Sequence, residues 1–98
     1  MAAYFIARYN VTNTVGYAAY GAAVRPTFEG HDVEFLVVDP AGDVLEGSPP
    51  QVTVVLKFPS KDAALAWYNS PEYQAIRHLR TNNSEGDAIL VEGFSPPA

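Results

Sequence analysis

The order of the predicted secondary structure elements indicates an α+β domain of βαββαβ topology, with a four-stranded antiparallel sheet and helices on one face. Three observations support this fold class. The chain has 98 residues, about the size of one small domain. Strand and helix patterns alternate along it, and turn-forming residues separate them. We therefore expect one domain over residues 1–98, with residues 95–98 as a flexible tail.

The first half of the chain begins with an aromatic strand. Residues 3–9 read AYFIARY, and the Asn and Thr residues that follow can cap a helix. Val and Ala at helical spacing then predict a helix from about residue 14, which Pro26 should end or kink near Arg25. Residues 33–38 read VEFLVV and predict the second strand.

The second half contains the strongest strand pattern, VTVVLKF at residues 52–58, in which β-branched residues dominate. Ser60 and Ser70 are each of a residue type that caps helix starts, and Pro71 suits a first helical position. The remaining elements predicted from these patterns are helices 61–69 and 71–80, a polar loop 81–87 and a last strand 88–94.

The composition excludes several kinds of chemistry. There are no cysteines, so disulfides, thiolate nucleophiles and Cys-ligated metals are absent. A formal net charge of -5, with six dispersed Lys and Arg residues, opposes nucleic-acid binding. No apolar run approaches the roughly 20 residues of a membrane helix, and the start lacks the basic region of a signal peptide. We expect a cytoplasmic protein without membrane or nucleic-acid partners.

The sheet face without helices is predicted to be half apolar. Strict alternation along the strands points these apolar residues outward: Tyr4, Ile6, Leu36, Val38 and Val55. An apolar patch of this kind indicates contact with another surface, and two copies could cover it by pairing their sheets. We therefore expect a homodimer. The alternative is a monomer whose long loop before residue 52 folds over the sheet.

Three charged residues, Arg8, Glu34 and Lys57, are expected on the same outward face. The predicted strand pairing brings them toward one end of that face. If they are buried between subunits, they must be paired, because an isolated buried charge costs several kcal/mol. They form either a structural ion-pair network or a ligand site.

The junction of the two later helices is a candidate ligand site. Tyr68, Ser70 and Tyr73 lie there, where backbone amides and hydroxyl groups could hold an anionic or carbonyl group. The structural alternative is that Ser70 caps a helix while the tyrosines pack with their hydroxyl groups at the rim. Arg77 and Arg80, on the same helix, could serve one local anionic group.

Tyrosine and histidine supply the other candidates. Tyr20 is included because a pocket formed by tyrosines would suit a flat organic molecule. His31 and His78 lack the short spacing of a two-histidine metal site, so no metal is expected. Surface roles are favoured for both, and His78 is kept as a weaker candidate for a contact with a ligand such as haem. No Ser-His-acid arrangement or phosphate-binding glycine loop is present, and no cofactor is expected.

Several segments together resemble one family. FPS at residues 58–60, WYNSPEYQ at 67–74, LVEG at 90–93 and LEG at 45–47 resemble elements of the domain-of-unknown-function family 1330. The resemblance covers nearly the whole chain. It implies a ferredoxin-like subunit that pairs with a second copy as a dimeric α+β barrel. Lys57 stands where members often carry Glu.

The resemblance leaves the chemistry open, because that barrel group includes cofactor-free monooxygenases, isomerases, haem enzymes and stress-related proteins. The first functional hypothesis is a homodimer that binds a small apolar or aromatic molecule between sheet and helices. The second is a cofactor-free isomerase or monooxygenase of a small cyclic substrate, with Tyr, His or Glu moving protons. A third, RNA binding on the sheet face, would require exposed stacking aromatics in basic surroundings, where only Tyr4 is expected.

Overall fold

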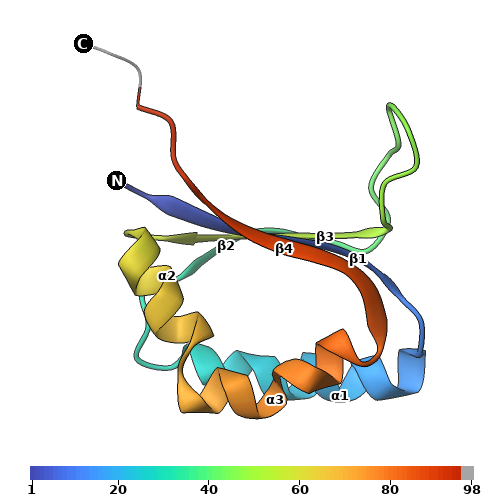
Figure 1. Ribbon diagram of the computed structural model, residues 1–98, viewed down its shortest axis with the longest axis horizontal. Helices are drawn as coiled ribbons and strands as arrows, with labels where there is room; N and C mark the ends of the chain where they lie inside the picture. The colour runs from blue at the N-terminus through green and yellow to red at the C-terminus, as the bar shows by residue number, and fades with distance from the viewer. Residues whose placement is uncertain (96–98) are drawn as a thin grey trace.

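Strands and helices follow one another in the predicted order in the computed structural model, which describes residues 1–95 (Figure 1). The predicted tail at residues 95–98 lies outside the described residues except for Ser95. The elements are β1 (Ala3–Val11), α1 (Thr14–Val24), the 3₁₀ helix η1 (Arg25–Phe28), β2 (Glu34–Asp39), β3 (Val52–Phe58), α2 (Lys61–Tyr68), α3 (Pro71–Thr81) and β4 (Ser84–Glu92).

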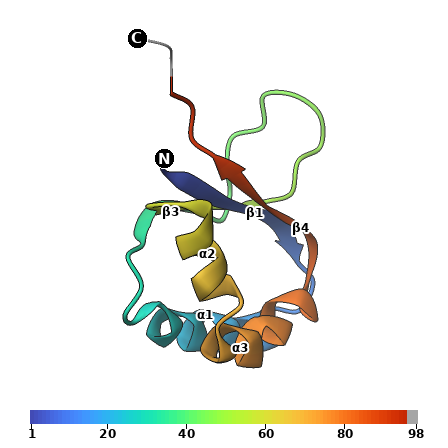
Figure 2. The same ribbon diagram turned by 60° about the vertical axis from the view of Figure 1, so that its left-hand side comes forward.

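The sheet has the strand order β2-β3-β1-β4, and all neighbouring strands are antiparallel. The helices lie together on one face of this sheet, as both ribbon views show (Figures 1 and 2). The predicted α+β class, with a four-stranded antiparallel sheet and one helical layer, is confirmed. The central strands β1 and β3 carry the side chains that face the helices.

Helix starts and ends follow local chemistry. The Asn13 side chain accepts a hydrogen bond from the Gly16 amide at 3.1 Å, and the Ser60 hydroxyl accepts one from the Ala63 amide at 3.1 Å. Both bonds satisfy amides that the first helical turn leaves free. Pro26 ends α1 as predicted, and the chain continues as η1.

The prediction of a loop over residues 81–87 is wrong, because β4 already begins at Ser84. This strand pairs with β1 along its whole length, from Ser84 opposite Val11 to Glu92 opposite Ala3. Its first residues are polar because they are largely exposed at the sheet edge. Gly86 is required within the strand, since a Cβ there would lie 2.1 Å from the Arg8 carbonyl oxygen.

A β-bulge in β2 changes the predicted faces of this strand. The register shifts between Phe35 and Val37, so Val37 lies opposite Val55 and Val38 lies opposite Val54. Directly opposed residues share a face, and Val38 therefore faces the helices while Val37 faces away. The strict alternation that placed Val38 outward is wrong from Val37 onward.

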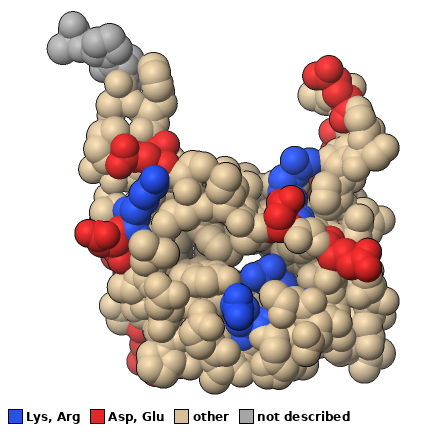
Figure 3. Space-filling model, in the orientation of Figure 1, with Lys and Arg blue, Asp and Glu red and all other residues tan. Residues whose placement is uncertain are grey.

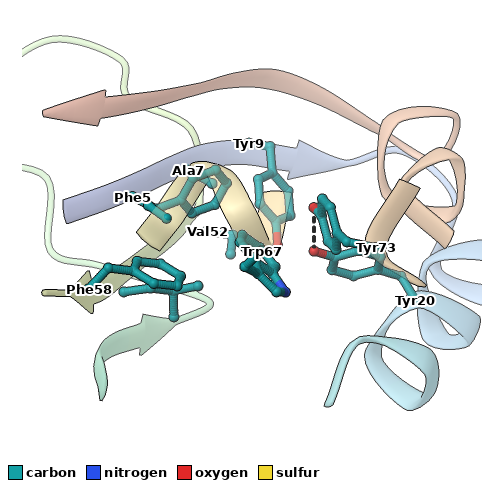
Figure 4. Packing of buried hydrophobic residues seen from close by; sticks show 10 residues of the cluster. Phe5, Ala7, Tyr9, Tyr20, Val52, Phe58, Trp67 and Tyr73 are labelled. Atoms are coloured by element: carbon teal, nitrogen blue, oxygen red, sulfur yellow. Dashed lines mark hydrogen bonds between the residues drawn. The ribbon is translucent and has the colours of Figure 1, made fainter. Parts of the chain in front are cut away.

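The core is built from aromatic rings around Trp67, which is 1% exposed. The Trp67 ring stacks on Phe28 at 4.7 Å between centroids and lies 5.7 Å from Phe58 and 4.2 Å from Tyr73. Figure 4 shows the buried rings between the sheet and the helices. These rings fix the spacing of the two layers.

The opposite sheet face is open in the single chain. The loop between β2 and β3 projects away from the helical layer, and so does the segment after β4 (Figures 1 and 2). Leu45 in this loop is 92% exposed and Phe94 after β4 is 88% exposed. The two projections flank a broad hollow in Figure 3, and the loop does not fold over the sheet.

Candidate functional site

A cavity of about 220 Å³ lies between the sheet and the helices. The sheet contributes one wall, and α1, η1, Trp67 of α2 and Arg80 of α3 contribute the other. This volume exceeds the roughly 150 Å³ of an engineered apolar cavity that holds benzene. The residues that line it are Phe5, Ala7, Tyr9, Tyr17, Tyr20, Gly21, Val24, Arg25, Phe28, Phe35, Val38, Val54, Leu56, Trp67 and Arg80.

One part of the cavity is apolar and aromatic. Phe28 stacks on Trp67 with 15° between the ring planes, and its edge meets Phe35 at 5.1 Å between centroids. The indole nitrogen of Trp67 donates to the Thr27 hydroxyl at 3.0 Å, which fixes the ring. This arrangement offers flat apolar surfaces to a ring system.

Another part of the cavity is lined by tyrosines. The hydroxyl groups of Tyr9 and Tyr17 are 2.6 Å apart, and those of Tyr20 and Tyr73 are 3.0 Å apart (Figure 4). Burial is the main cause that raises the pKa of Tyr9, with its hydrogen bond to Tyr17 next. Burial and the neighbouring Tyr73 raise the pKa of Tyr20. Both phenols are therefore neutral and protonated near neutral pH.

Arg80 lies beside these tyrosines and is 7% exposed. Its guanidinium carbon stands 5.7 Å from the centre of the Tyr9 ring, within cation–π range. Burial opposes its charge, but electrostatic interactions with Tyr73 and Tyr20 hold its pKa above the ordinary value. The cavity therefore contains one buried, permanently charged cation.

The candidate residues named from the sequence separate into two groups. Tyr20 and Arg80 line the cavity, and Tyr73 touches it through the Tyr20 hydroxyl. Ser70 caps α3, accepting from the Tyr73 amide at 3.2 Å and donating to the Trp67 carbonyl at 2.7 Å. The two remaining candidates, Tyr68 and His78, are absent from the cavity lining.

Tyr68 and His78 have other surroundings. The Tyr68 hydroxyl accepts a hydrogen bond from Arg77 at 3.0 Å, and its ring lines a separate depression against β4. His78 is exposed on α3. Of the helix-junction residues, the structure therefore brings Tyr73 beside Arg80 but places Tyr68 in other surroundings.

The predicted charged cluster of Arg8, Glu34 and Lys57 is not formed. Lys57 lies opposite Glu34 on β2, as expected, but it also lies opposite Tyr4 on β1. Arg8 lies at the other end of β1, because antiparallel pairing runs β1 and β3 in opposite directions. Figure 3 shows charged side chains at both ends of the open face with a largely uncharged floor between them.

Several cavity residues were not predicted as site residues. The sequence shows Tyr9 and Tyr17 only as aromatic residues. Their spacing along the chain does not reveal that their hydroxyl groups form a hydrogen bond. Phe28 and Arg25 lie in η1, where Pro26 redirects the chain. Val38 could be recognised as a cavity residue only once the β-bulge in β2 was known. The abundance of tyrosine, six in 98 residues, was the one usable sequence signal.

Two structural features are absent from residues 1–95. Within that range no group of three or more His, Asp or Glu side chains is placed to hold a metal ion. None of the helices in the same range is long and apolar enough to cross a membrane.

Solved structures of similar shape define the class of protein. A protein of unknown function from Rhodopseudomonas palustris has TM-score 0.74 and 15% identity, over 97% of this chain and 84% of that chain. SnoaB, a cofactor-independent oxygenase from Streptomyces nogalater, has TM-score 0.68 and 11% identity, over 97% of this chain and 95% of that chain. A dimeric protein of ferredoxin-like fold and unknown function from Bacteroides fragilis has TM-score 0.63 and 12% identity, over 94% of this chain and 96% of that chain. The chain therefore has the ferredoxin-like α+β fold.

The sequence gives a narrower assignment within this class. Residues 2–94 match the model described as Domain of unknown function (DUF1330). The chain belongs to this family, and the resemblance stated from its sequence elements is confirmed. No protein with a curated description matches the sequence.

Proposed function

We propose that this protein is a homodimer that binds a small apolar or aromatic molecule between its sheet and its helices. The observation that carries the proposal is the cavity of about 220 Å³, walled by the stacked rings of Phe28 and Trp67. Ligand sites are typically concave and apolar with a few polar groups. The tyrosine hydroxyl groups, the buried Arg80 and the exposed Arg25 are those polar groups here.

The open sheet face supports the homodimer. Its apolar residues are continuous across all four strands, since Val37 lies opposite Val55, Val55 opposite Ile6, and Ile6 opposite Ile89. Ile89, at the edge-strand end of this row, is 57% exposed. Two such faces in contact would remove both from water. The similar protein from Bacteroides fragilis is described as dimeric.

The binding proposal is tested with tetralone, a neutral bicyclic ketone, and with the fluorescence of the sole tryptophan, Trp67. We expect saturable quenching, because the ring lines the cavity. Val38→Phe, at the cavity wall, should weaken binding at least about tenfold, or about 1.4 kcal/mol. Val15→Phe, on an 83% exposed position of α1, is the matched control. No saturable quenching, or equal loss in both variants, would count against the proposal.

A second candidate function is cofactor-free catalysis on a small cyclic substrate by isomerisation or monooxygenation. The buried cation of Arg80 beside protonated phenols favours it, because such groups stabilise the oxygen of an enolate. In this step a C–H bond next to a carbonyl breaks, the proton leaves to a solvent base, and the electron pair moves onto the carbonyl oxygen. The likeness to SnoaB is compatible with such chemistry but shows the fold alone.

Catalysis is tested separately from binding by following deuterium uptake at the acidic C–H positions of tetralone in heavy water by NMR. An enzyme that stabilises the enolate should accelerate this exchange over buffer, and Arg80→Met should remove the acceleration. Exchange at the buffer rate, together with saturable binding, would leave the protein as a binding protein.

A further inference from the structure

The chemical class of the ligand follows from the surroundings of Arg80, and this inference rests on the proposed binding function. Arg80 is in the last turn of α3 and is more than nine-tenths buried. Its Nε atom is buried without a hydrogen-bond partner among residues 1–95. Within the same residues, no Asp or Glu carboxylate pairs with it, and the groups that raise its pKa are phenols.

A buried cation without a counter-ion requires explanation, since removing a charge from water costs several kcal/mol when nothing compensates it. The carbonyl groups at the end of α3 supply part of the compensation through the helix dipole, and the Tyr9 ring supplies a cation–π contact. Neither of them provides an acceptor for Nε. Arg80 is one of the residues that line the cavity, so its positive charge lies at the cavity wall.

The tyrosine hydroxyl groups add further donors. Tyr9 and Tyr17 share one hydrogen bond, and Tyr20 and Tyr73 share another. Each hydroxyl group carries one proton, so each pair has two donors but uses one of them. One O–H per pair is left to donate outside the pair. The phenol oxygens can also accept hydrogen bonds, and those of Tyr20 and Tyr73 interact with Arg80. The described lining of the cavity nevertheless contains no carboxylate, so its polar part combines positive charge and free O–H donors with no negative charge.

We propose that the ligand is a small organic anion whose acidic oxygen, of a carboxylate, phenolate or enolate, binds at Arg80 and the adjacent tyrosine hydroxyl groups. Its apolar body occupies the part of the cavity lined by Phe28 and Trp67. Such an oxygen only accepts hydrogen bonds, and it carries the negative counter-charge that the guanidinium group lacks. Bonds of this kind, between charged partners, are the stronger ones in proteins.

The experiment compares naphthoate with naphthamide, which share a ring system and differ in charge, by calorimetry on the wild-type protein. We expect naphthoate to bind about ten to a hundred times more tightly, as hydrogen bonds to charged groups allow. Arg80→Met should remove this preference while naphthamide still binds, and Arg80→Lys should keep part of it. Arg77→Met, the matched control on α3, removes an arginine that bonds Tyr68 outside the cavity lining and should keep the full preference.

The outcomes separate this inference from the binding function on which it rests. If naphthamide and naphthoate bind equally, the cavity is a ligand site and the anion assignment is wrong. If neither compound binds, both proposals fail. Should the Arg80 variants not fold, para-nitrophenol gives the answer on the wild-type protein. Its visible absorbance should show a pKa about one to three units lower when bound, as a nearby cation dictates, and an unchanged pKa would overturn the inference.

Discussion

The two faces of the sheet differ although the same strands form both. On β1 the side chains that face the helices, such as Phe5 and Tyr9, are at most 7% exposed, whereas their neighbours Ile6 and Arg8 remain accessible. The covered face is completed by helices of the same chain, and a cavity is left within it. The open face carries apolar residues that no other part of residues 1–95 covers. The strand β1 thus contributes side chains both to the covered face, which contains the cavity, and to the open apolar face.

The largest expected effect breaks the covered face. Trp67→Ala removes the ring that contacts Phe28, Phe58 and Tyr73 and should lower the free energy of unfolding by about 3–5 kcal/mol. This loss is a large part of the roughly 5–15 kcal/mol that stabilises a typical domain. Urea unfolding followed by circular dichroism measures it. Val15→Ala, on an exposed position, should stay within about 0.5 kcal/mol, and similar losses in both variants would contradict the packing described.

The next effect tests the open face. Ile89→Glu places a charge in the part of the apolar patch that β4 contributes and should raise the dissociation constant of the proposed dimer at least about a hundredfold, or about 2.7 kcal/mol. Sedimentation should show wild-type protein at twice 10.6 kDa and the variant at 10.6 kDa. The variant should keep its circular dichroism spectrum, since Ile89 is not in the core.

A matched control uses the other side of the molecule. Val15→Glu adds the same charge to an exposed position of α1 and should leave the mass unchanged. A wild-type protein that stays monomeric at every concentration would refute the homodimer. Equal dissociation by both variants would refute the open face as its interface.

The sequence was sufficient for the fold because local patterns determine each element. β-branched runs, Ser caps and prolines predicted the strands and helices, and every predicted strand and helix exists. The errors occurred where pairing with another strand outweighs local preference. Gly86 is typical of a turn but lies within β4, since its position against β1 leaves no room for a Cβ. The bulge at Leu36 reversed the faces of Val37 and Val38 in the same way.

The site was less predictable because it depends on contacts between distant residues. Tyr20 and Tyr73 are 53 positions apart, and only the packing of α1 against α3 brings their hydroxyl groups together. Arg80 was a candidate from its charge, but its burial and the absence of a carboxylate partner among the described residues are tertiary facts. Antiparallel pairing of β1 and β3 likewise places Arg8 and Lys57 toward opposite ends of the two strands.

The smallest effect sharpens the description of the covered face through its titration. The pKa values of Tyr9 and Tyr20 are raised in the folded protein, mainly by burial. In the unfolded chain both should ionise near pH 10. A raised pKa means that their contribution to stability is complete below about pH 10 and is lost as the pH rises, because the unfolded chain releases protons that the folded protein retains.

Each of these tyrosines should therefore add about 1.4 kcal/mol per pH unit to the fall in unfolding free energy above about pH 10. Tyr20→Phe removes one titrating group and should reduce this slope by that amount, in addition to about 1 kcal/mol lost at neutral pH with the hydrogen bond to Tyr73. Urea unfolding at several alkaline pH values measures both quantities. A slope that is identical in wild-type and variant would mean that Tyr20 ionises as readily in the folded protein as in the unfolded chain, and its hydroxyl group would then not lie in the dry, donor-rich part of the cavity.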